Sequence, residues 1–126
     1  MSNWHFYNPN PLGLKTGDCT VRALCAVTEM DWETMHTRLC DLARRMGDMP
    51  SADRVWWELL RRYGFNRQGL VDQCPDCYTV NDFCEDHPIG KYVLGPHEHA
   101  VAVIDGKYWD AWDSGATVPT YFFRRF

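Results

Sequence analysis

The chain has 126 residues, of which 45% are hydrophobic and 14% aromatic, so it can bury one core and we expect a single domain over residues 1–126. Its formal net charge of −4 argues against a general nucleic-acid-binding protein, which is usually basic. We therefore expect no nucleic-acid partner. No apolar stretch approaches the roughly 20 residues that span a bilayer, so we expect no membrane partner. No signal-peptide pattern opens the chain, so we expect a cytoplasmic protein with free thiols.

The first two thirds of the chain predict helices joined by short loops. Residues 1–17 are rich in Asn, Pro and Gly and predict an irregular arm. The helices are expected over residues 18–28, 31–47, 51–64 and 79–87, with one short strand around residues 70–71. Asp18, Asp31 and Thr79 stand where residues that cap helix N-termini are found.

After Pro88 the pattern changes from helical spacing to short runs rich in β-branched and aromatic residues. The four predicted strands lie in "GKYVLG", "HAVAVI", "KYWDAWD" and "TVPTYFF". Asp105-Gly106 between the second and third runs is a strong hairpin signal. The order of elements predicts an α+β fold, in which N-terminal helices pack on a C-terminal antiparallel sheet of about four strands.

Cys19 stands on the first turn of the first predicted helix, in "TGDCTVRALCAV". Backbone N–H groups and the positive end of the helix dipole point at this position, which lowers the pKa of a thiol and makes it a nucleophile. Cys25, by contrast, falls mid-helix on the apolar side, as a buried structural cysteine does. His99 begins the second predicted strand, so the helical half and the sheet half would each supply one member of a Cys–His pair.

Two acids follow His99 as candidates for the group that orients its imidazole, Asp110 and Asp113. If Asp105-Gly106 forms a two-residue turn, Asp110 shares the face of His99 and Asp113 does not. One bulged residue near the turn reverses this assignment. Spacing alone leaves both acids open.

The segments "GDC" at a helix start, "HAVAVIDG" and "WDS", in this order, resemble the papain-like cysteine peptidase superfamily. The stretch "GKYWDAWDS" is also similar in spacing to Josephin deubiquitinases and to the peptidase domains of bacteriocin exporters, and small papain-like proteins of bacteria and their phages share the whole pattern. The resemblance implies a papain-like fold and a thiol hydrolase acting on peptide or isopeptide bonds. It makes Cys19 the nucleophile and His99 the general base and then acid. It favours Asp113 as the third member, because the superfamily's Asn or Asp falls at the end of its strand, just before Ser.

One position departs from the superfamily, which usually places Gln or Asn five or six residues before the nucleophile to help form the oxyanion hole. Here Leu14 and Gly13 stand there, so Asn8, Asn10 or Thr16 would have to substitute by folding back with the arm. Loss of such a donor typically costs about 10²–10³ in rate. The alternative function is therefore a catalytically weak papain-like binding module, phage- or prophage-encoded, that binds or blocks a host protein. The oligomeric state is left open.

The segment "CPDCYTVNDFCEDH" offers a competing chemistry, because its cysteines and histidine have the C-x₂-C…C-x₂-H spacing of a structural zinc site. These residues are Cys74, Cys77, Cys84 and His87. The gap of six residues is short for such a site, and the predicted helix at 79–87 turns Cys84 inward. The pair His97 and His99 in "PHEHA" lacks a third ligand. We expect free thiols at Cys74 and Cys77, no bound metal and no cofactor.

Overall fold

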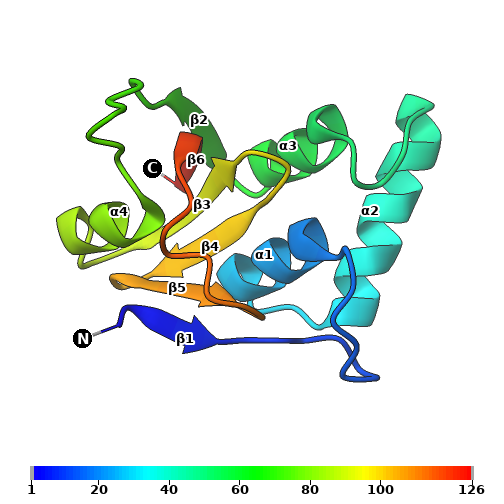
Figure 1. The fold of residues 1–126 in the computed structure, drawn as a ribbon. Coiled ribbons are helices and arrows are strands. Elements are labelled where there is room, and N and C mark those ends of the chain that lie inside the picture. The colour runs from blue at the N-terminus through cyan, green and yellow to red at the C-terminus, as the bar shows by residue number, and fades with distance from the viewer. Residues whose placement is uncertain (1, 126) are drawn as a thin grey trace.

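The computed structural model describes residues 2–125, and its order of elements is α+β (Figure 1). The helices are α1 (Cys19–Thr28), α2 (Trp32–Met46), α3 (Asp53–Arg62) and α4 (Val80–Asp86). The strands are β1 (Trp4–Phe6), β2 (Phe65–Gly69), β3 (Lys91–Pro96), β4 (Val101–Ile104), β5 (Lys107–Asp110) and β6 (Pro119–Arg125). The four predicted helices and the four C-terminal strands are thus confirmed.

The sheet is larger than expected and is mixed, with six strands in the order β1-β5-β4-β3-β6-β2. The prediction of about four antiparallel strands is wrong, because a further strand lies at each edge of the sheet and one pairing is parallel. The arm at residues 1–17 contributes β1, which pairs parallel to β5, and β2 begins at Phe65 and not near residue 70. Both edge strands are short and largely exposed, so their sequences carry little of the alternation that marks a strand.

Helix α2 follows its capping signals, whereas α1 and α3 have no side-chain cap at their N-termini. Asp31 caps α2 by accepting from the Thr34 N–H, and Gly47 ends it in the left-handed conformation. Asp18 precedes α1 but makes no side-chain capping bond. The Asp18 side chain instead turns to other partners, which bear on the site described below.

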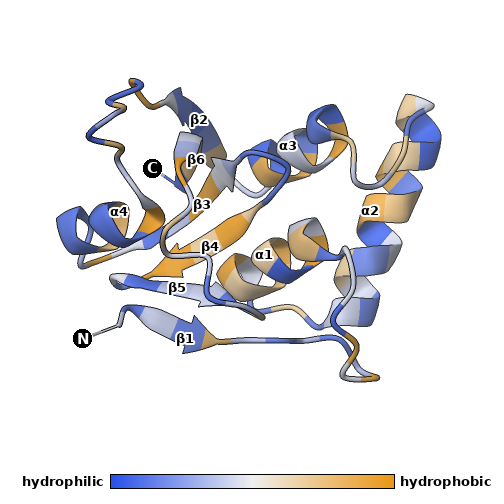
Figure 2. Ribbon diagram, viewed as in Figure 1, coloured by the Kyte–Doolittle hydropathy of each residue, from blue (hydrophilic) through white to orange (hydrophobic). Residues whose placement is uncertain are grey.

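The sheet separates two apolar clusters. Residues that alternate along the strands divide between them: Val93, Ala102 and Phe123 face α1, α2 and α3, while Leu94, Val103 and Phe122 face α4. Helix α1 lies directly on β3, β4 and β5, and α2 packs against α1 and α3 (Figure 1). The hydropathy colouring shows apolar residues along β4 and on α1, with polar residues over the outward side of α2 (Figure 2). Burial of α1 against the sheet fixes where its first residue, Cys19, stands.

The segment before α4 corrects the cysteine expectation. Cys74 and Cys77 form a disulfide and are not free thiols, because the turn at residues 74–76 brings their Cα atoms to 4.1 Å. Thr79 caps α4 with a capping box, as its spacing to Asp82 allows. His87 stacks on Phe83 and its Nδ1 contacts the Phe83 carbonyl oxygen. Within residues 2–125 no helix is long and apolar enough to cross a membrane.

Candidate active site

Cys19 is the first residue of α1, and its half-buried thiol faces the loop that leads into β4. The Cys19 thiol interacts with the His99 side chain and with the backbone N–H of Ala100. Helix α1 packs on β4, so the start of the helix and the residues preceding the strand meet at one end of the sheet. The structure therefore brings Cys19 and His99 together, as their positions at the starts of two elements predicted.

The carboxylate that contacts His99 belongs to Asp110, the last residue of β5. His99 Nε2 lies 2.7 Å from Asp110 Oδ2, and the other ring nitrogen is left for Cys19. The choice of Asp113 as this partner is wrong in geometry. Asp113 accepts hydrogen bonds from the Tyr108 hydroxyl and from the Gly115 N–H.

The hairpin between β4 and β5 explains why Asp110 holds this place. Ile104 pairs with Lys107 and Ala102 with Trp109, so Asp105 and Gly106 form a plain two-residue turn without a bulge. This is the register in which Asp110 shares the face of His99. The strand register thus indicated the acid that contacts His99, whereas the resemblance to the superfamily favoured Asp113, which the structure does not bring to His99.

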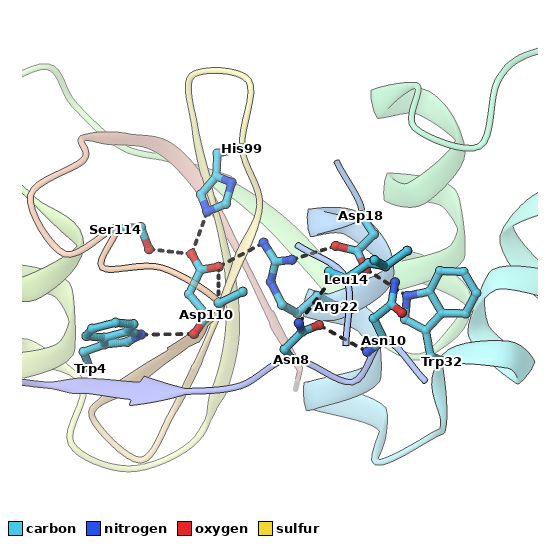
Figure 3. A network of polar contacts seen from close by, with 11 residues as sticks. Trp4, Asn8, Asn10, Leu14, Asp18, Arg22, Trp32, His99, Asp110 and Ser114 are labelled. Carbon is cyan, nitrogen blue, oxygen red and sulfur yellow. Dashed lines mark hydrogen bonds and ion pairs between the residues drawn. The ribbon is translucent and has the colours of Figure 1, made fainter. Parts of the chain in front are cut away.

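A buried polar network surrounds Asp110, which is 0% exposed (Figure 3). The Ser114 hydroxyl donates to Oδ2 at 2.6 Å, and the Ala111 N–H donates to Oδ1 at 2.8 Å. Arg22 Nη2 lies 2.9 Å from the same Oδ1. On its other side Arg22 Nη1 donates to Asp18 at 2.7 Å, and Asp18 also accepts from Trp32 Nε1 at 2.9 Å.

Sequence reasoning missed Arg22 and Ser114. One signal for Arg22 was available, because Asp18 and Arg22 are four residues apart and such a pair shares a helix face. The link from Arg22 to Asp110, 88 positions further along the chain, has no local signal.

The network shifts the pKa values of Cys19, His99 and Asp110. Burial by itself raises the thiol pKa of Cys19, but the hydrogen bond and charge of His99, the Ala100 N–H and the charge of Arg22 bring it below its usual value. Burial lowers the pKa of His99, yet its bonds to Asp110 and Cys19 raise it to about 9. Burial raises the pKa of Asp110, and its bonds to His99 and Ser114, with the charges of His99 and Arg22, lower it overall. Both shifts favour the charged forms, so thiolate and imidazolium are more stable here than in an isolated thiol and imidazole.

Two clefts meet at Cys19 and His99. The large cleft has a volume of about 570 Å³ and runs between the start of α3, the loop before β4 and Tyr121 of β6. The small cleft, of about 190 Å³, lies beside Lys15 and Trp112. Gly17, Cys19, Glu98 and His99 line both, so the thiol stands where the two clefts adjoin. The Trp112 ring packs 4.9 Å from the His99 ring and covers it on the small-cleft side.

The arm does not supply the side-chain amide that the superfamily uses. The Asn8 amide nitrogen donates to the Leu14 carbonyl oxygen, and its oxygen accepts from the Asn10 N–H. The Asn10 oxygen accepts from the Leu12 N–H. Both amides thus shape the turn of the arm (Figure 3). The start of α1, which lacks a side-chain cap, presents backbone N–H groups beside the thiol.

The competing metal sites are not assembled among residues 2–125, where no group of three or more His, Cys, Asp or Glu side chains is placed to hold a metal ion. Cys84 is buried in the cluster beneath α4, and Cys74 and Cys77 are bonded to each other. His97 is 92% exposed and lies 4.0 Å from Glu98.

Comparison with known proteins returns no matching family model, no matching curated protein and no matching solved structure. The functional conclusion therefore depends on the geometry of this chain and on the chemistry of its residues.

Proposed function

We propose that the protein is a small papain-like thiol hydrolase that cleaves peptide or isopeptide bonds. The observation that carries the proposal is the contact chain from Cys19 to His99 to the buried Asp110, placed where two clefts meet. A nucleophile bonded to a base, and a base bonded to an orienting carboxylate, is the arrangement that nucleophilic acyl transfer requires. Cys19 is the nucleophile, His99 the base and acid, and Asp110 takes the role expected for Asp113.

The reaction follows from the protonation state of the pair. The Cys19 thiolate attacks the substrate carbonyl carbon, and the carbonyl π electrons move to oxygen. Backbone N–H groups at the start of α1, with that of Cys19 foremost, face the developing oxyanion. As the intermediate collapses, the C–N bond breaks and the imidazolium of His99 gives its proton to the leaving amine.

The thioester that remains on Cys19 is then hydrolysed. His99, now neutral, takes a proton from water as the water oxygen attacks the thioester carbonyl. Collapse breaks the C–S bond and releases a carboxylic acid, and the thiolate–imidazolium pair is restored. Asp110 keeps its negative charge throughout and fixes the ring so that one nitrogen faces Cys19.

The shape of the site supports a chain-like substrate. A large cleft on one side of Cys19 and a small cleft on the other leave room for residues on both sides of the scissile bond. Gly17 lies on the floor common to both, and a Cβ added to it would meet nothing within 4 Å. The backbone of an extended peptide can therefore pass close to the thiol.

The alternative is a binding module with the same fold and weak chemistry. It is favoured by the placement of Asn8 and Asn10, which bond within the arm and line neither cleft, so that no side-chain amide of the arm stands beside the thiol; of the three candidate donors Thr16 lines the small cleft. Removal of one donor from such a site costs about 10²–10³ in rate, so this alternative predicts a reactive thiol with slow turnover.

The test is labelling with an electrophilic peptide probe at neutral pH, with the modified cysteine mapped by mass spectrometry. We expect modification of Cys19 in the native protein, loss of labelling in Cys19→Ala, and full labelling in Cys40→Ala. Cys40 is the matched control, because it is a free cysteine of similar exposure with His36 at 3.9 Å. Labelling of Cys40 with no preference for Cys19 contradicts the proposal. Labelling of Cys19 without hydrolysis of any peptide in a mixed library selects the binding module.

A further inference from the structure

We propose that Arg22 is a positioning residue of this site, which fixes the Asp110 carboxylate and ties the helix carrying Cys19 to the strand carrying Asp110. The inference rests on the proposed function and adds a residue outside the three assigned to the chemistry. Arg22 makes no hydrogen bond or ion pair with the thiol, although its charge lowers the pKa of Cys19 and its side chain lines the small cleft. Its positioning role acts through Asp110.

The geometry of Arg22 joins two distant parts of the chain. Arg22 lies three residues after Cys19 on α1, and its side chain is 4% exposed. One guanidinium nitrogen lies 2.7 Å from Asp18 and the other 2.9 Å from Asp110 (Figure 3). Any shift of the start of α1 away from the end of β5 would break this bridge, so the bridge limits the distance between Cys19 and the His99–Asp110 pair.

The bonds at Asp110 divide evenly between its two oxygens. Oδ2 lies against His99 Nε2 and the Ser114 hydroxyl, and Oδ1 against Arg22 and the Ala111 N–H. Arg22 supplies the only charged donor on Oδ1 among the described residues. Without Arg22 the carboxylate would keep a single neutral donor on that oxygen and could rotate away from His99.

The charge balance gives Arg22 a second effect. Asp110 is fully buried, and a carboxylate there needs opposite charge close by to stay ionised. His99 supplies this charge only while protonated, and it gives up its proton during the reaction. Arg22 stays cationic throughout, so Asp110 remains a carboxylate when His99 is neutral.

The residue type fits the role. Arginine offers five N–H donors in a rigid planar fork, which can satisfy two carboxylates at once, whereas lysine is a single point charge. Asp18 holds the opposite branch of the fork and is itself held by Trp32 Nε1. A buried ion pair is weak evidence for stability, so positioning the site is the better reason for this one.

The test is the pH dependence of Cys19 alkylation by iodoacetamide in Asp18→Asn and in Asp18→Asn/Arg22→Met. Asp18→Asn keeps the bond from Arg22 to Asp110 and the double variant removes it, and the double variant has the same net charge as the wild type. Lys15, Asp53, His97 and Glu98 also line the clefts and are the same in both proteins. The alkylation rate of Cys19 rises with pH as the thiol ionises, and we call this rise the acid limb of the profile. We expect the midpoint of the acid limb to lie about one pH unit higher in the double variant than in Asp18→Asn, because a nearby charge in a partly buried site has this order of effect.

Identical profiles in the two variants, with only a lower melting temperature in the double variant, would overturn the proposal and leave Arg22 a structural residue. If the double variant does not fold, Arg22→Lys gives the answer. It keeps the cation and loses the fork, so we expect an acid limb close to wild type but slower alkylation at the plateau. A wild-type plateau rate in Arg22→Lys overturns the proposal as well. Failure of the proposed function is distinct, since Cys19 of the wild type would then react no faster than Cys40.

Discussion

Two cysteine–histidine pairs among residues 2–125, Cys19 with His99 and Cys40 with His36, differ in their surroundings. Cys19 and His99 meet at the end of the sheet, and Cys40 and His36 meet on the outer surface of α2, 3.9 Å apart. Both cysteines are half-buried and free. The His99 side chain is 10% exposed and lies on a buried carboxylate, whereas His36 is exposed and stacks on Trp32.

The difference shows that proximity of sulfur and imidazole is not what defines the site. A helix places residues four apart on one face, so a Cys–His contact such as that of Cys40 arises locally and without tertiary structure. The pair at Cys19 adds a helix start, an orienting carboxylate and a cleft, each supplied by a different element. The following predictions separate the two pairs by experiment, beginning with the largest effect.

The carboxylate behind His99 should matter most. Asp110→Asn removes the charge that orients and stabilises the imidazolium, and we expect peptide hydrolysis to fall by about 10²–10⁴-fold. Asp113→Asn keeps an acceptor for the Tyr108 hydroxyl and should change the rate by less than about threefold. Steady-state kinetics of both variants decide the matter, and equal losses would show that the network acts on folding and not on His99.

The imidazole should matter next, and only at one of the two pairs. His99→Ala removes the hydrogen bond and the positive charge that lower the thiol pKa of Cys19, so alkylation of Cys19 at pH 7 should slow by about 10–10²-fold. His36→Ala should leave the alkylation rate of Cys19 unchanged. The measurement is the rate of carboxamidomethylation at each cysteine by peptide mapping. A slowing at Cys19 in His36→Ala would contradict the assignment.

Hydrolysis and alkylation should differ in their response to alkaline pH. The His99 pKa is raised to about 9, so the proton that His99 gives to the leaving amine is present below that pH and lost as the pH rises through it. The rate of hydrolysis should therefore fall near pH 9, while the rate of Cys19 alkylation, which needs only the thiolate, should not fall. Because the titrations of Cys19 and His99 are coupled, the pH of this fall is a property of the pair and not of His99 alone. A fall of both rates together would instead indicate unfolding.

The smallest effect should come from charge in the large cleft. Asp53 and Glu98 line this cleft, and no Lys or Arg is among its lining residues. Because both carboxylates are exposed, we expect only a few-fold preference for substrates with Lys or Arg over Glu, and a loss of this preference at high salt. Asp53→Asn should weaken the preference, and Asp76→Asn, an exposed change outside the clefts, should not. Cleavage of paired peptides at two salt concentrations tests this.

Local physics explains which elements were predictable. Asp31, Gly47 and Thr79 act on the backbone within a few residues of themselves, so the ends of α2 and α4 follow directly from the sequence. The four C-terminal strands follow from their apolar and aromatic runs, and the turn at Asp105-Gly106 fixes the β4–β5 register. The edge strands β1 and β2 were not predictable as such, because exposed residues that gain their hydrogen bonds from distant partners leave no periodic signal.

The sequence by itself determined the α+β order of elements, the place of Cys19 at the start of α1 and the place of His99 just before β4, because caps, periodicity and turn chemistry act over short distances. Only the tertiary structure decided which acid meets His99, how Arg22 joins Asp18 to Asp110, and that the Asn8 and Asn10 amides stay within the arm. These contacts depend on how a helix start and two strand ends pack together. A shift of one residue in strand register moves a side chain to the other face of the sheet. Once the Asp110 carboxylate is buried, it needs partners of opposite charge close by, because an unpaired buried charge is strongly destabilising.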